Sequence, residues 1–336
     1  MTRAPAFRFA AARTANRLVA GVPAAARLAQ GFAAKSGEPL VLVIADGGAL
    51  NPHTRAEIAR LAPGLAVQIA DPAWKEAVPA EALTDPVTMA TWLAGEPLPA
   101  PTDPGAALAL AARAIIRATA KPSDGMIARH INRPLSQAVS AQLLRLRWVR
   151  PGHATILTAL AALAMLACLL VFPSPAGLAA GAVLFQLASV IDGVDGEIAR
   201  ATRRSSKVGA SLDSLVDAFT NCAFLAGAGI SFGAQGKEAT ALICTAALAV
   251  QVIGLTILGL RAWRREGVVH FDSAKAAVAP DGNGAGRLLK DLTSRDFYCF
   301  AFMLASLAGA LGPAIAVFLA GSAVWLTFVI RTAVRG

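Results

Sequence analysis

The stretch "AAGAVLFQLASVIDGVDGEIAR" (Ala179–Arg200) joins an apolar run directly to two aspartates, a glutamate and an arginine. Its first part is apolar enough to lie within a lipid bilayer, whereas acids are scarce in the chain, with 21 Asp and Glu among 336 residues. A buried carboxylate costs free energy unless it is paired with a cation or binds a metal ion. The stretch therefore predicts a membrane helix whose acidic end has a positively charged partner.

The composition of the whole chain indicates a membrane protein rather than an ordinary soluble enzyme. Hydrophobic residues make up 56% of the chain and charged residues 15%. Up to about Lys121 the sequence is rich in alanine and proline with scattered charges. From Ala154 onward it contains apolar runs long enough to cross a bilayer core of about 30 Å. We therefore expect a small soluble head followed by a membrane body.

Six apolar runs predict six transmembrane helices, and the fifth run is the shortest. The runs cover Ala154–Phe172, Ala176–Ile198, Val208–Phe232, Ala239–Leu260, Phe297–Leu311 and Pro313–Ile330. The expected fold class is an α-helical integral membrane protein with a small N-terminal α/β domain on the cytoplasmic side.

Charges in the loops between these runs predict the orientation of the helices. Lys and Arg next to transmembrane helices favour the cytoplasmic side. They cluster after the second, fourth and sixth runs, whereas the loops on the opposite side contain Lys237 alone. Both termini and the acidic end at Asp192 are therefore expected on the cytoplasmic side of the cell (inner) membrane. The net charge of +10 then orients the helices and attracts anionic membrane lipids, and it indicates no nucleic-acid partner.

The residues before the membrane body predict a small α/β domain. "PLVLVIA" (Pro39–Ala45) and "LAVQIA" (Leu65–Ala70) are typical of strands, and "NPHTRAEIARLA" (Asn51–Ala62) between them is typical of a capped helix. Asp46 and Asp71 each follow a strand, a position where α/β domains often bind ligands. Aspartate is also common there as a plain turn former.

The first thirty-odd residues are rich in Arg and Ala and contain no acids, as a targeting peptide would be. Pro23 and Arg27 interrupt every apolar stretch among them, so a secretory signal is not expected. The proline-rich segment "GEPLPAPTDPG" (Gly95–Gly105) closes the head.

The acids fall on one face of each of two neighbouring helices. A helix turns by about 100° per residue, so two acids and two small residues share one narrow arc of the first helix. These are Asp192, Asp195, Gly196 and Ala199, with Arg200 at the edge. On the next helix, successive i, i+4 positions are occupied by Gly209, Asp213 and Asp217. Because a short loop joins the two helices, the four aspartates can converge.

Converging carboxylates require cations between them. Two unit charges at about 4 Å interact by roughly 4 kcal/mol at an effective dielectric constant near 20. Oxygen ligands without His or Cys favour Mg²⁺, Mn²⁺ or Ca²⁺ over zinc. Mg²⁺ usually keeps positions open for substrate phosphates, and Gly196, Ala199 and Gly209 leave room for a bulky group. The residues therefore predict a divalent-metal site that binds a pyrophosphate.

The segment "DGVDGEIARATRRSSKVGASLDSLVD" (Asp192–Asp217) resembles the signature of the CDP-alcohol phosphotransferase (phosphatidyltransferase) family. It matches Asp-x2-Asp-Gly-x2-Ala-Arg-x8-Gly-x3-Asp-x3-Asp at every fixed position, and the resemblance extends roughly from Lys121 to the C-terminus. It implies two divalent cations, Mg²⁺ or Mn²⁺, held by Asp192, Asp195, Asp213 and Asp217. It also implies that Asp217 is the general base and that the CDP group is seated by Gly196, Ala199, Arg200 and Gly209.

"KPSDGMIARHINRPLS" (Lys121–Ser136) is similar to the juxtamembrane amphipathic helix of family members that carry a fused cytidylyltransferase head and join inositol units. Members often have Pro-Asn before the first span, where this chain has Pro151-Gly152. "RLVAGVPAAARLAQGFA" (Arg17–Ala33) is similar to part of such a head, but the "GxGxR" nucleotide loop is missing. We therefore expect a degenerate, inactive head over residues 1–115, the amphipathic helix over 121–150 and a six-helix transferase domain over 151–336.

The resemblance implies a membrane transferase that moves a phosphoalcohol group, phosphatidyl or similar, from a CDP-alcohol to an acceptor hydroxyl and releases CMP. The donor is CDP-diacylglycerol or a CDP-polyol and the acceptor an alcohol or a sugar phosphate, in phospholipid or inositol-phosphodiester biosynthesis; a homodimer is compatible with it. Arg133, Arg261 and Arg295 are candidates to bind an acceptor phosphate, or alternatively lipid headgroups. The alternative functions are an inactive membrane scaffold and a cation transporter that uses the Asp cluster.

Overall fold

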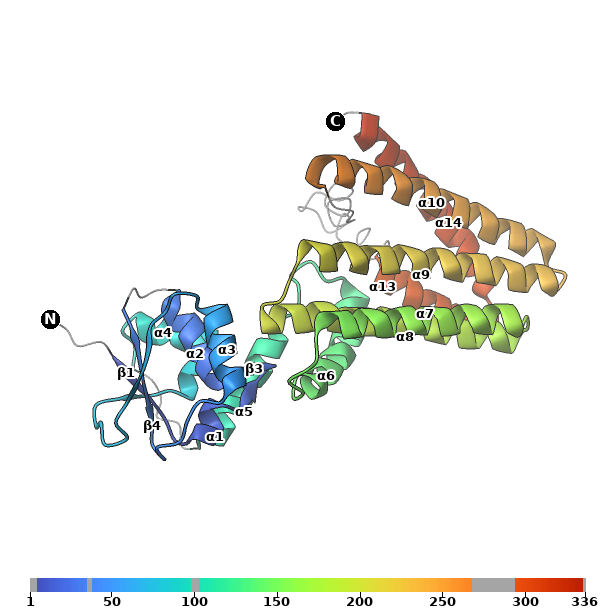
Figure 1. Ribbon diagram of the computed structural model, residues 1–336. Coiled ribbons are helices and arrows are strands. Elements are labelled where there is room, and N and C mark those ends of the chain that lie inside the picture. Colours follow the sequence, from blue (N-terminus) through green and yellow to red (C-terminus); the bar gives the residue numbers. More distant parts are fainter. Residues whose placement is uncertain (1–4, 35–37, 98–102, 268–293, 335–336) are drawn as a thin grey trace. The chain divides into compact units, whose positions relative to one another are not determined.

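The computed structural model describes residues 5–34, 38–97, 103–267 and 294–334, and Figure 1 traces them along the chain. The chain divides into two compact units. Unit 1 comprises Met1–Ala120, Gln137–Val149 and Glu197–Arg204, and unit 2 comprises Lys121–Ser136, Arg150–Gly196 and Ser205–Gly336. Much of the basic loop predicted after the fourth apolar run lies outside the described residues.

Unit 1 is built on a parallel sheet whose strands lie in the order β5-β4-β1-β6. The strands are β1 (Ala6–Phe9), β4 (Leu40–Ile44), β5 (Val67–Ala70) and β6 (Val78–Pro79). All five residues of β4 are buried, as is usual for a strand inside a parallel sheet. The predicted strands are confirmed at β4 and β5, whereas β1 lies in the Arg- and Ala-rich segment for which no strand was predicted.

Short helices accompany this sheet. They are α1 (Ala12–Ala15), α2 (Ala24–Ala33), α3 (Pro52–Leu61), α4 (Pro86–Leu93) and α5 (Pro104–Arg117), with a 3₁₀ turn at Ala82–Thr84. The predicted capped helix is confirmed at α3, where the Asn51 side chain accepts a hydrogen bond of 2.7 Å from the Thr54 N–H. Strands β2 (Leu18–Val19) and β3 (Val22–Pro23) form a separate antiparallel hairpin.

Unit 2 is helical. Five of its described helices are long and apolar enough to cross a membrane, judged by length and composition. They are α7 (Pro151–Val171), α8 (Pro175–Thr202), α9 (Lys207–Ala234), α10 (Glu238–Glu266) and α14 (Leu311–Val334). The remaining predicted span coincides with α13 (Arg295–Leu307), which has 13 residues. At 1.5 Å per residue a helix of that length covers about 20 Å, less than the bilayer core of about 30 Å.

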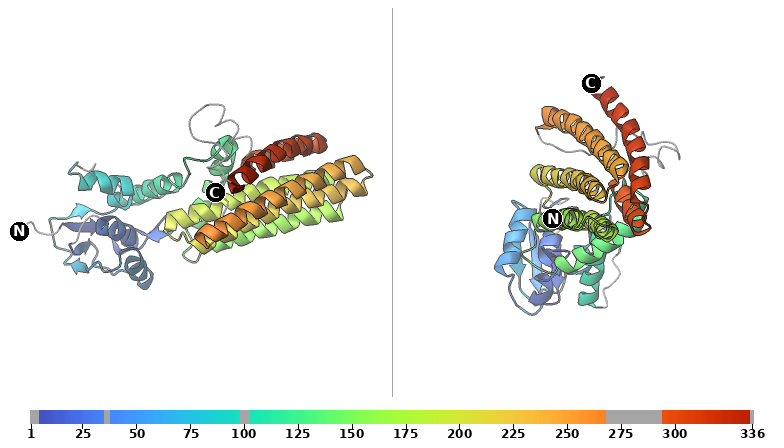
Figure 2. Two further views of the ribbon diagram at one scale, coloured as in Figure 1. Left: turned by 90° about the horizontal axis from the view of Figure 1, so that it is seen from above. Right: turned by 90° about the vertical axis from the view of Figure 1, so that its right-hand side faces the viewer.

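The long helices of unit 2 pack side by side, with α9 against α7 and α10, and α10 against α14 (Figures 1 and 2). Aromatic rings join α8, α9 and α13. Phe185 stacks on Phe224 with ring centroids 4.4 Å apart, and Phe224 lies 5.6 Å from Phe302. This stack fixes the short helix α13 against the two helices that carry the aspartates.

The segment between the head and α7 contains less helix than the range 121–150 predicted for it. One π-helical turn (Ala128–Asn132) leads into α6 (Arg133–Leu143). The preceding residues form a turn that Asp124 closes by accepting a hydrogen bond of 2.9 Å from the Lys121 N–H. The helical part therefore begins at Met126, two residues after Asp124.

Candidate active site

The site begins at the joint between α8 and α9. Helix α8 ends at Thr202, and Arg203 adopts a left-handed backbone conformation with φ of 55°. Helix α9 begins after Ser206, whose side chain accepts a hydrogen bond of 3.0 Å from the Gly209 N–H. Ser206 is thus a typical N-cap. Because only four residues separate the two helices, the acids at the end of α8 and the start of α9 are brought together.

Three carboxylates converge between α8 and α9, about two to three helical turns away from this joint. Asp192 of α8 and Asp213 and Asp217 of α9 each offer one oxygen, and these oxygens lie within 4.8 Å of one another. All three side chains are half-buried. The i, i+4 spacing on α9 places Asp213 and Asp217 on one face, as the sequence indicated.

The fourth aspartate of the signature has a different neighbour. Asp195 is buried, and its Oδ2 accepts a hydrogen bond of 2.7 Å from the Thr155 hydroxyl of α7. It is not a member of the group of three oxygens within 4.8 Å. Thr155 therefore orients Asp195 beside the triad, and no motif in the sequence pointed to this threonine.

Arg295, at the start of α13, reaches the triad from a distant part of the sequence. Its Nη1 lies 2.5 Å from Asp217 Oδ1 and 3.2 Å from Asp192 Oδ2. Its Nε donates a hydrogen bond of 3.2 Å to the Asn221 side chain. Arg295 is thus an intramolecular counterion for two of the three acids. The sequence offered one signal for it, a charged pair, Arg295–Asp296, at the start of an apolar run.

The triad fits a divalent cation better than it fits the arginine alone. Among the described residues, Arg295 contributes one positive charge to the three carboxylates. Asp213 Oδ1 is buried, and no hydrogen-bond partner for it occurs among the described residues. A buried polar atom without a partner is costly, and a carboxylate-only donor set suits a hard cation such as Mg²⁺ or Mn²⁺. The residues present therefore fit the metal that the sequence predicted.

The four small or basic residues of the signature lie along the same two helices. Gly196, Ala199 and Arg200 occupy the last two turns of α8 and are half-buried, whereas Gly209 lies exposed in the first turn of α9. Arg200 is anchored, because its Nε donates a hydrogen bond of 2.8 Å to the Thr119 carbonyl. The signature thus presents small residues next to the acids and a fixed arginine one turn further along.

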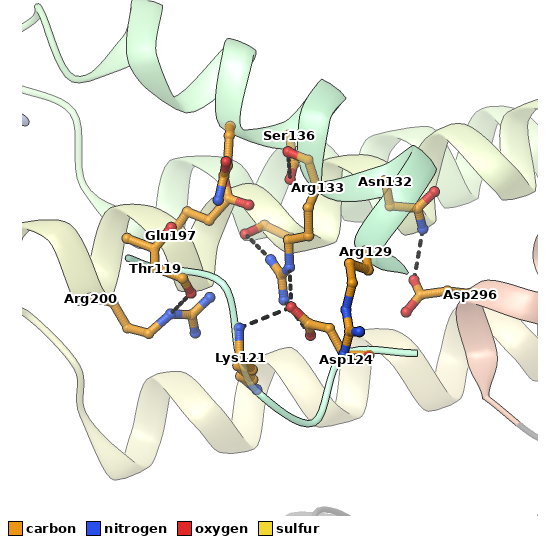
Figure 3. A network of polar contacts seen from close by, with 12 residues as sticks. Thr119, Lys121, Asp124, Arg129, Asn132, Arg133, Ser136, Glu197, Arg200 and Asp296 are labelled. Carbon is orange, nitrogen blue, oxygen red and sulfur yellow. Dashed lines mark hydrogen bonds and ion pairs between the residues drawn. The ribbon is translucent and has the colours of Figure 1, made fainter. Parts of the chain in front are cut away.

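Polar contacts hold the segment before α7 in place within unit 2 (Figure 3). Arg133 donates from Nε and Nη2 to the two oxygens of Asp124, at 2.8 and 3.0 Å. Asn132 donates to Asp296 Oδ1 at 2.8 Å, and Ser189 donates to the same oxygen at 2.8 Å. This second contact fixes the first turn of α13, from which Arg295 extends to the triad.

The pKa of Asp124 is held below its usual range. Burial by itself would raise this pKa, but the hydrogen bonds and charge of Arg133, together with the Lys121 N–H, outweigh it. Of the three arginines considered for an acceptor phosphate, Arg133 is therefore committed to Asp124, Arg295 contacts the acids, and Arg261 lies in the last two turns of α10.

In the head, the aspartates that follow β4 and β5 bind backbone groups. Asp46 accepts hydrogen bonds from the Ala12 N–H at 2.9 and 3.1 Å. The neighbouring Ala10 N–H donates to Glu81 Oε1 at 2.8 Å. Asp71 accepts a hydrogen bond of 2.7 Å from the Ala73 N–H, as a plain turn former does. The amide groups that follow β1 are thus occupied by carboxylates.

Comparison with known proteins identifies the helical part of the chain. Residues 151–330, more than half of the chain, match the family model described as CDP-alcohol phosphatidyltransferase. This range includes the whole acidic signature, Asp192–Asp217, and all five candidate membrane spans except the last four residues of α14.

Curated relatives share part of this region. A "Bifunctional IPC transferase and DIPP synthase" of Thermococcus kodakarensis is 38% identical over 117 residues, which is 34% of this chain and 26% of that protein. Proteins of the same name from Aquifex aeolicus and Archaeoglobus fulgidus are 42% and 41% identical over 102 and 116 residues, or 30% and 34% of this chain and 22% of each relative. The matched segment thus spans about a quarter of the length of these relatives.

Proposed function

The chain belongs to the CDP-alcohol phosphatidyltransferase family, and from this premise we propose that it transfers a phosphoalcohol group from a CDP-alcohol to an acceptor hydroxyl with release of CMP. The observation that carries the proposal is the convergence of Asp192, Asp213 and Asp217 within 4.8 Å. Three converging carboxylates are suited to divalent cations that bring a pyrophosphate with them.

The site residues have distinct roles in this proposal. Asp192, Asp195, Asp213 and Asp217 hold two divalent cations, Mg²⁺ or Mn²⁺. When bound, these cations neutralise the pyrophosphate of the donor and the charge on the departing CMP. The small residues Gly196, Ala199 and Gly209 let the CDP group approach the helices, and Arg200 contributes a fixed positive charge beside it.

Asp217 acts as the general base. It accepts the proton of the acceptor hydroxyl as that oxygen attacks the phosphorus that bears the alcohol. The new oxygen–phosphorus bond forms while the bond from the same phosphorus to the CMP oxygen breaks, and CMP leaves with that electron pair. Arg295 Nη1 lies 2.5 Å from Asp217 Oδ1 and orients this carboxylate. Its Nη2 has no hydrogen-bond partner in the described part of the chain and is suited to an acceptor phosphate.

The donor is CDP-diacylglycerol or a CDP-polyol, and the acceptor is an alcohol or a sugar phosphate. The relatives' name, which joins an IPC transferase to a DIPP synthase, favours the inositol-phosphodiester branch over bulk phospholipid synthesis. The chain is an integral membrane protein with five described candidate spans. We further propose that α13 completes six spans, that both termini and the site face the cytoplasm at the inner membrane, and that membrane lipids surround the body. Nothing in this proposal requires a homodimer or a nucleic acid.

We propose that the head has lost cytidylyl-transfer activity. In a nucleotide-binding head, the amide groups after the first strand would bind phosphate. Here the Ala10 and Ala12 N–H groups donate to Glu81 and Asp46, and carboxylates at those positions would repel a phosphate. Incubation of the full chain with CTP and inositol phosphate should give no CDP-alcohol, and robust formation of one would overturn this part.

The test of the main proposal is to incubate purified protein with Mg²⁺, either CDP-diacylglycerol or CDP-inositol, and a panel of acceptors, and to follow CMP. Release that depends on both donor and acceptor, and that stops with EDTA, is the expected result. Asp71→Asn, in the head, is the matched control for Asp213→Asn. If neither donor yields CMP with any acceptor, the inactive scaffold is favoured, and Mg²⁺ flux into vesicles would favour the transporter.

A further inference from the structure

The last six residues of α8, 197–202, and the first two residues of the joint, Arg203 and Arg204, belong to unit 1 together with the head. A helix end leaves its final carbonyls without intrahelical partners. At this end the Arg204 N–H reaches back to the Ala199 carbonyl at 2.9 Å, around the left-handed Arg203. The carbonyls of Ala201, Thr202 and Arg203 therefore need donors from elsewhere.

Two arginines of the head supply those donors. Arg27 Nη2 donates to the Ala201 carbonyl at 2.7 Å. Arg60 donates from Nη2 to the Thr202 carbonyl at 2.8 Å and from Nη1 to the Arg203 carbonyl at 3.1 Å. Three successive carbonyls thus accept charge-assisted hydrogen bonds, which are stronger than neutral ones, at the negative end of the helix dipole.

Both arginines are themselves held in place. Arg27 is 5% exposed, and it also donates to the Val19 carbonyl at 3.0 Å and to the Ala20 carbonyl at 2.9 Å. Arg60 pairs with the buried Glu57 at 2.7 Å, and Glu57 also pairs with Arg204 of the joint itself. Both arginine side chains are therefore also held by contacts other than those with the carbonyls at the end of α8.

The turn of the β2–β3 hairpin also contacts the end of α8. Ala20 and Gly21 form its turn, with φ of 46° and 83°. A side chain at Gly21 would lie 2.6 Å from Leu144 Cδ2 and 2.9 Å from Thr202 Cγ2, so the hairpin touches the end of α8 at a point where only glycine fits. A left-handed alanine is strained, and its carbonyl is one of those that Arg27 binds.

We infer that the head is a positioning clamp for the last turn of α8, with Arg27 and Arg60 as its positioning residues. The clamp fixes the end of α8, the stretch that carries Arg200, and the proposed function assigns Arg200 to the CDP group. This inference rests on the proposed function for its effect on the donor, but the clamp itself rests on the contacts alone. The head thereby has a structural role that does not depend on cytidylyl-transfer activity.

The test uses the full chain in detergent, with Arg60→Gln as the main variant because Arg60 is partly exposed and its loss should leave the head folded. Arg55→Gln is the matched control, since Arg55 also bonds a carbonyl of the head, that of Leu50, but does not serve the end of α8. Trypsin cleavage is followed at the exposed joint after Arg203 and Lys207, and the KM for the CDP-alcohol and kcat are measured alongside. Arg27→Gln and Arg60→Lys complete the set.

Loss of charge-assisted hydrogen bonds should accelerate cleavage at the joint by about tenfold in Arg60→Gln and raise the donor KM by a similar factor, with kcat within about twofold. Arg60→Lys should recover part of both, and Arg27→Gln should resemble or exceed Arg60→Gln. Cleavage no faster than in Arg55→Gln would overturn the clamp, and faster cleavage with an unchanged donor KM would overturn its positioning role. If the wild type releases no CMP, the proposed function has failed, and the cleavage rates alone decide the clamp.

Discussion

Two stretches of α8 differ in the groups that need a partner: the first carries a carboxylate of the acidic triad, and the second ends in free backbone carbonyls that need donors. In the first, Asp192 joins Asp213 and Asp217 in a triad whose described counterion is Arg295. In the second, residues 197–204, arginines of the head saturate the carbonyls of Ala201, Thr202 and Arg203. Each stretch lies within its own compact unit, although a single helix runs through both.

The difference indicates which stretch binds an exchangeable ligand. Within the described residues, one arginine contacts the triad, and Asp213 Oδ1 has no hydrogen-bond partner there. At the end of the helix, by contrast, every donor is a protein group in a buried or half-buried setting. An exchangeable ligand suits the first stretch, and permanent intramolecular contacts suit the second.

The largest effect is expected from Asp217→Asn. Asparagine keeps the shape of the side chain but cannot accept the proton of the acceptor hydroxyl, so turnover should fall by about 10² to 10⁴. Single-turnover rates measure the chemical step, and calorimetry with Mg²⁺ measures donor affinity. Donor binding should survive. If it is lost as completely as in Asp192→Asn, Asp217 is chiefly a metal ligand and the base lies elsewhere.

Asp213→Asn should come next. Removing one anionic ligand weakens a site whose cation affinity depends on the number of charges, so CMP release should drop at least about tenfold even at high Mg²⁺. The steady-state rate of CMP release is the measurement, and Asp71→Asn in the head should be unchanged. A variant that retains most of its turnover would argue against metal binding at the triad.

Arg295→Gln tests whether the arginine substitutes for the metal. In EDTA, the variant leaves two half-buried carboxylates without this counterion, and its melting temperature should fall by a few degrees, about 2–4 °C for each kcal/mol lost. Saturating Mg²⁺ should reduce that difference, because the cation then neutralises the acids. Arg261→Gln is the control. An equal loss of stability with and without Mg²⁺ would mean that Arg295 serves the fold rather than the charge of the triad.

Glu57→Gln tests the permanent intramolecular contacts at the end of α8 and should have the smallest effect. Burial by itself would raise the pKa of Glu57. The hydrogen bond from Arg60 and the charges of Arg204 and Arg60 outweigh burial, so the pKa lies below its usual value. A lowered folded-state pKa contributes stability above the unfolded value of about 4.3, and that stability is lost as the pH falls through the folded pKa.

The melting temperature of Glu57→Gln should therefore lie below that of the wild type by a constant amount from about pH 8 to about pH 5, and the gap should close in more acidic buffer. Mg²⁺ should not change this gap, in contrast to Arg295→Gln. A gap that widens on acidification would contradict the ion-pair account of Glu57.

The sequence predicted what depends on local spacing and missed what depends on packing. The i, i+4 spacing of Asp213 and Asp217 and the short joint to α8 predicted four converging aspartates, and three of them have oxygens within 4.8 Å of one another. Arg295 lies 78 residues beyond Asp217, and its position depends on the aromatic stack and on Asp296, which periodicity does not report. Thr155 was missed for the same reason.

In the head, β4 was predicted because its residues form an uninterrupted apolar run, and all five are buried in the structure. Strand β1 was missed because its four residues, "AFRF", are too few for a pattern and lie in an Arg-rich context that resembles a targeting peptide. The roles of Arg27 and Arg60 could not be predicted either, since their partners are backbone carbonyls more than 140 residues away.

The most direct test of the central claim is calorimetric titration of Mg²⁺ into metal-free protein, for the wild type, Asp213→Asn and Arg60→Gln. The account predicts saturable binding by the wild type, at least about tenfold weaker binding by Asp213→Asn, and wild-type binding by Arg60→Gln, because the clamp shares no ligand with the triad. Wild-type affinity in Asp213→Asn, or no saturable binding in any of the three, would contradict it.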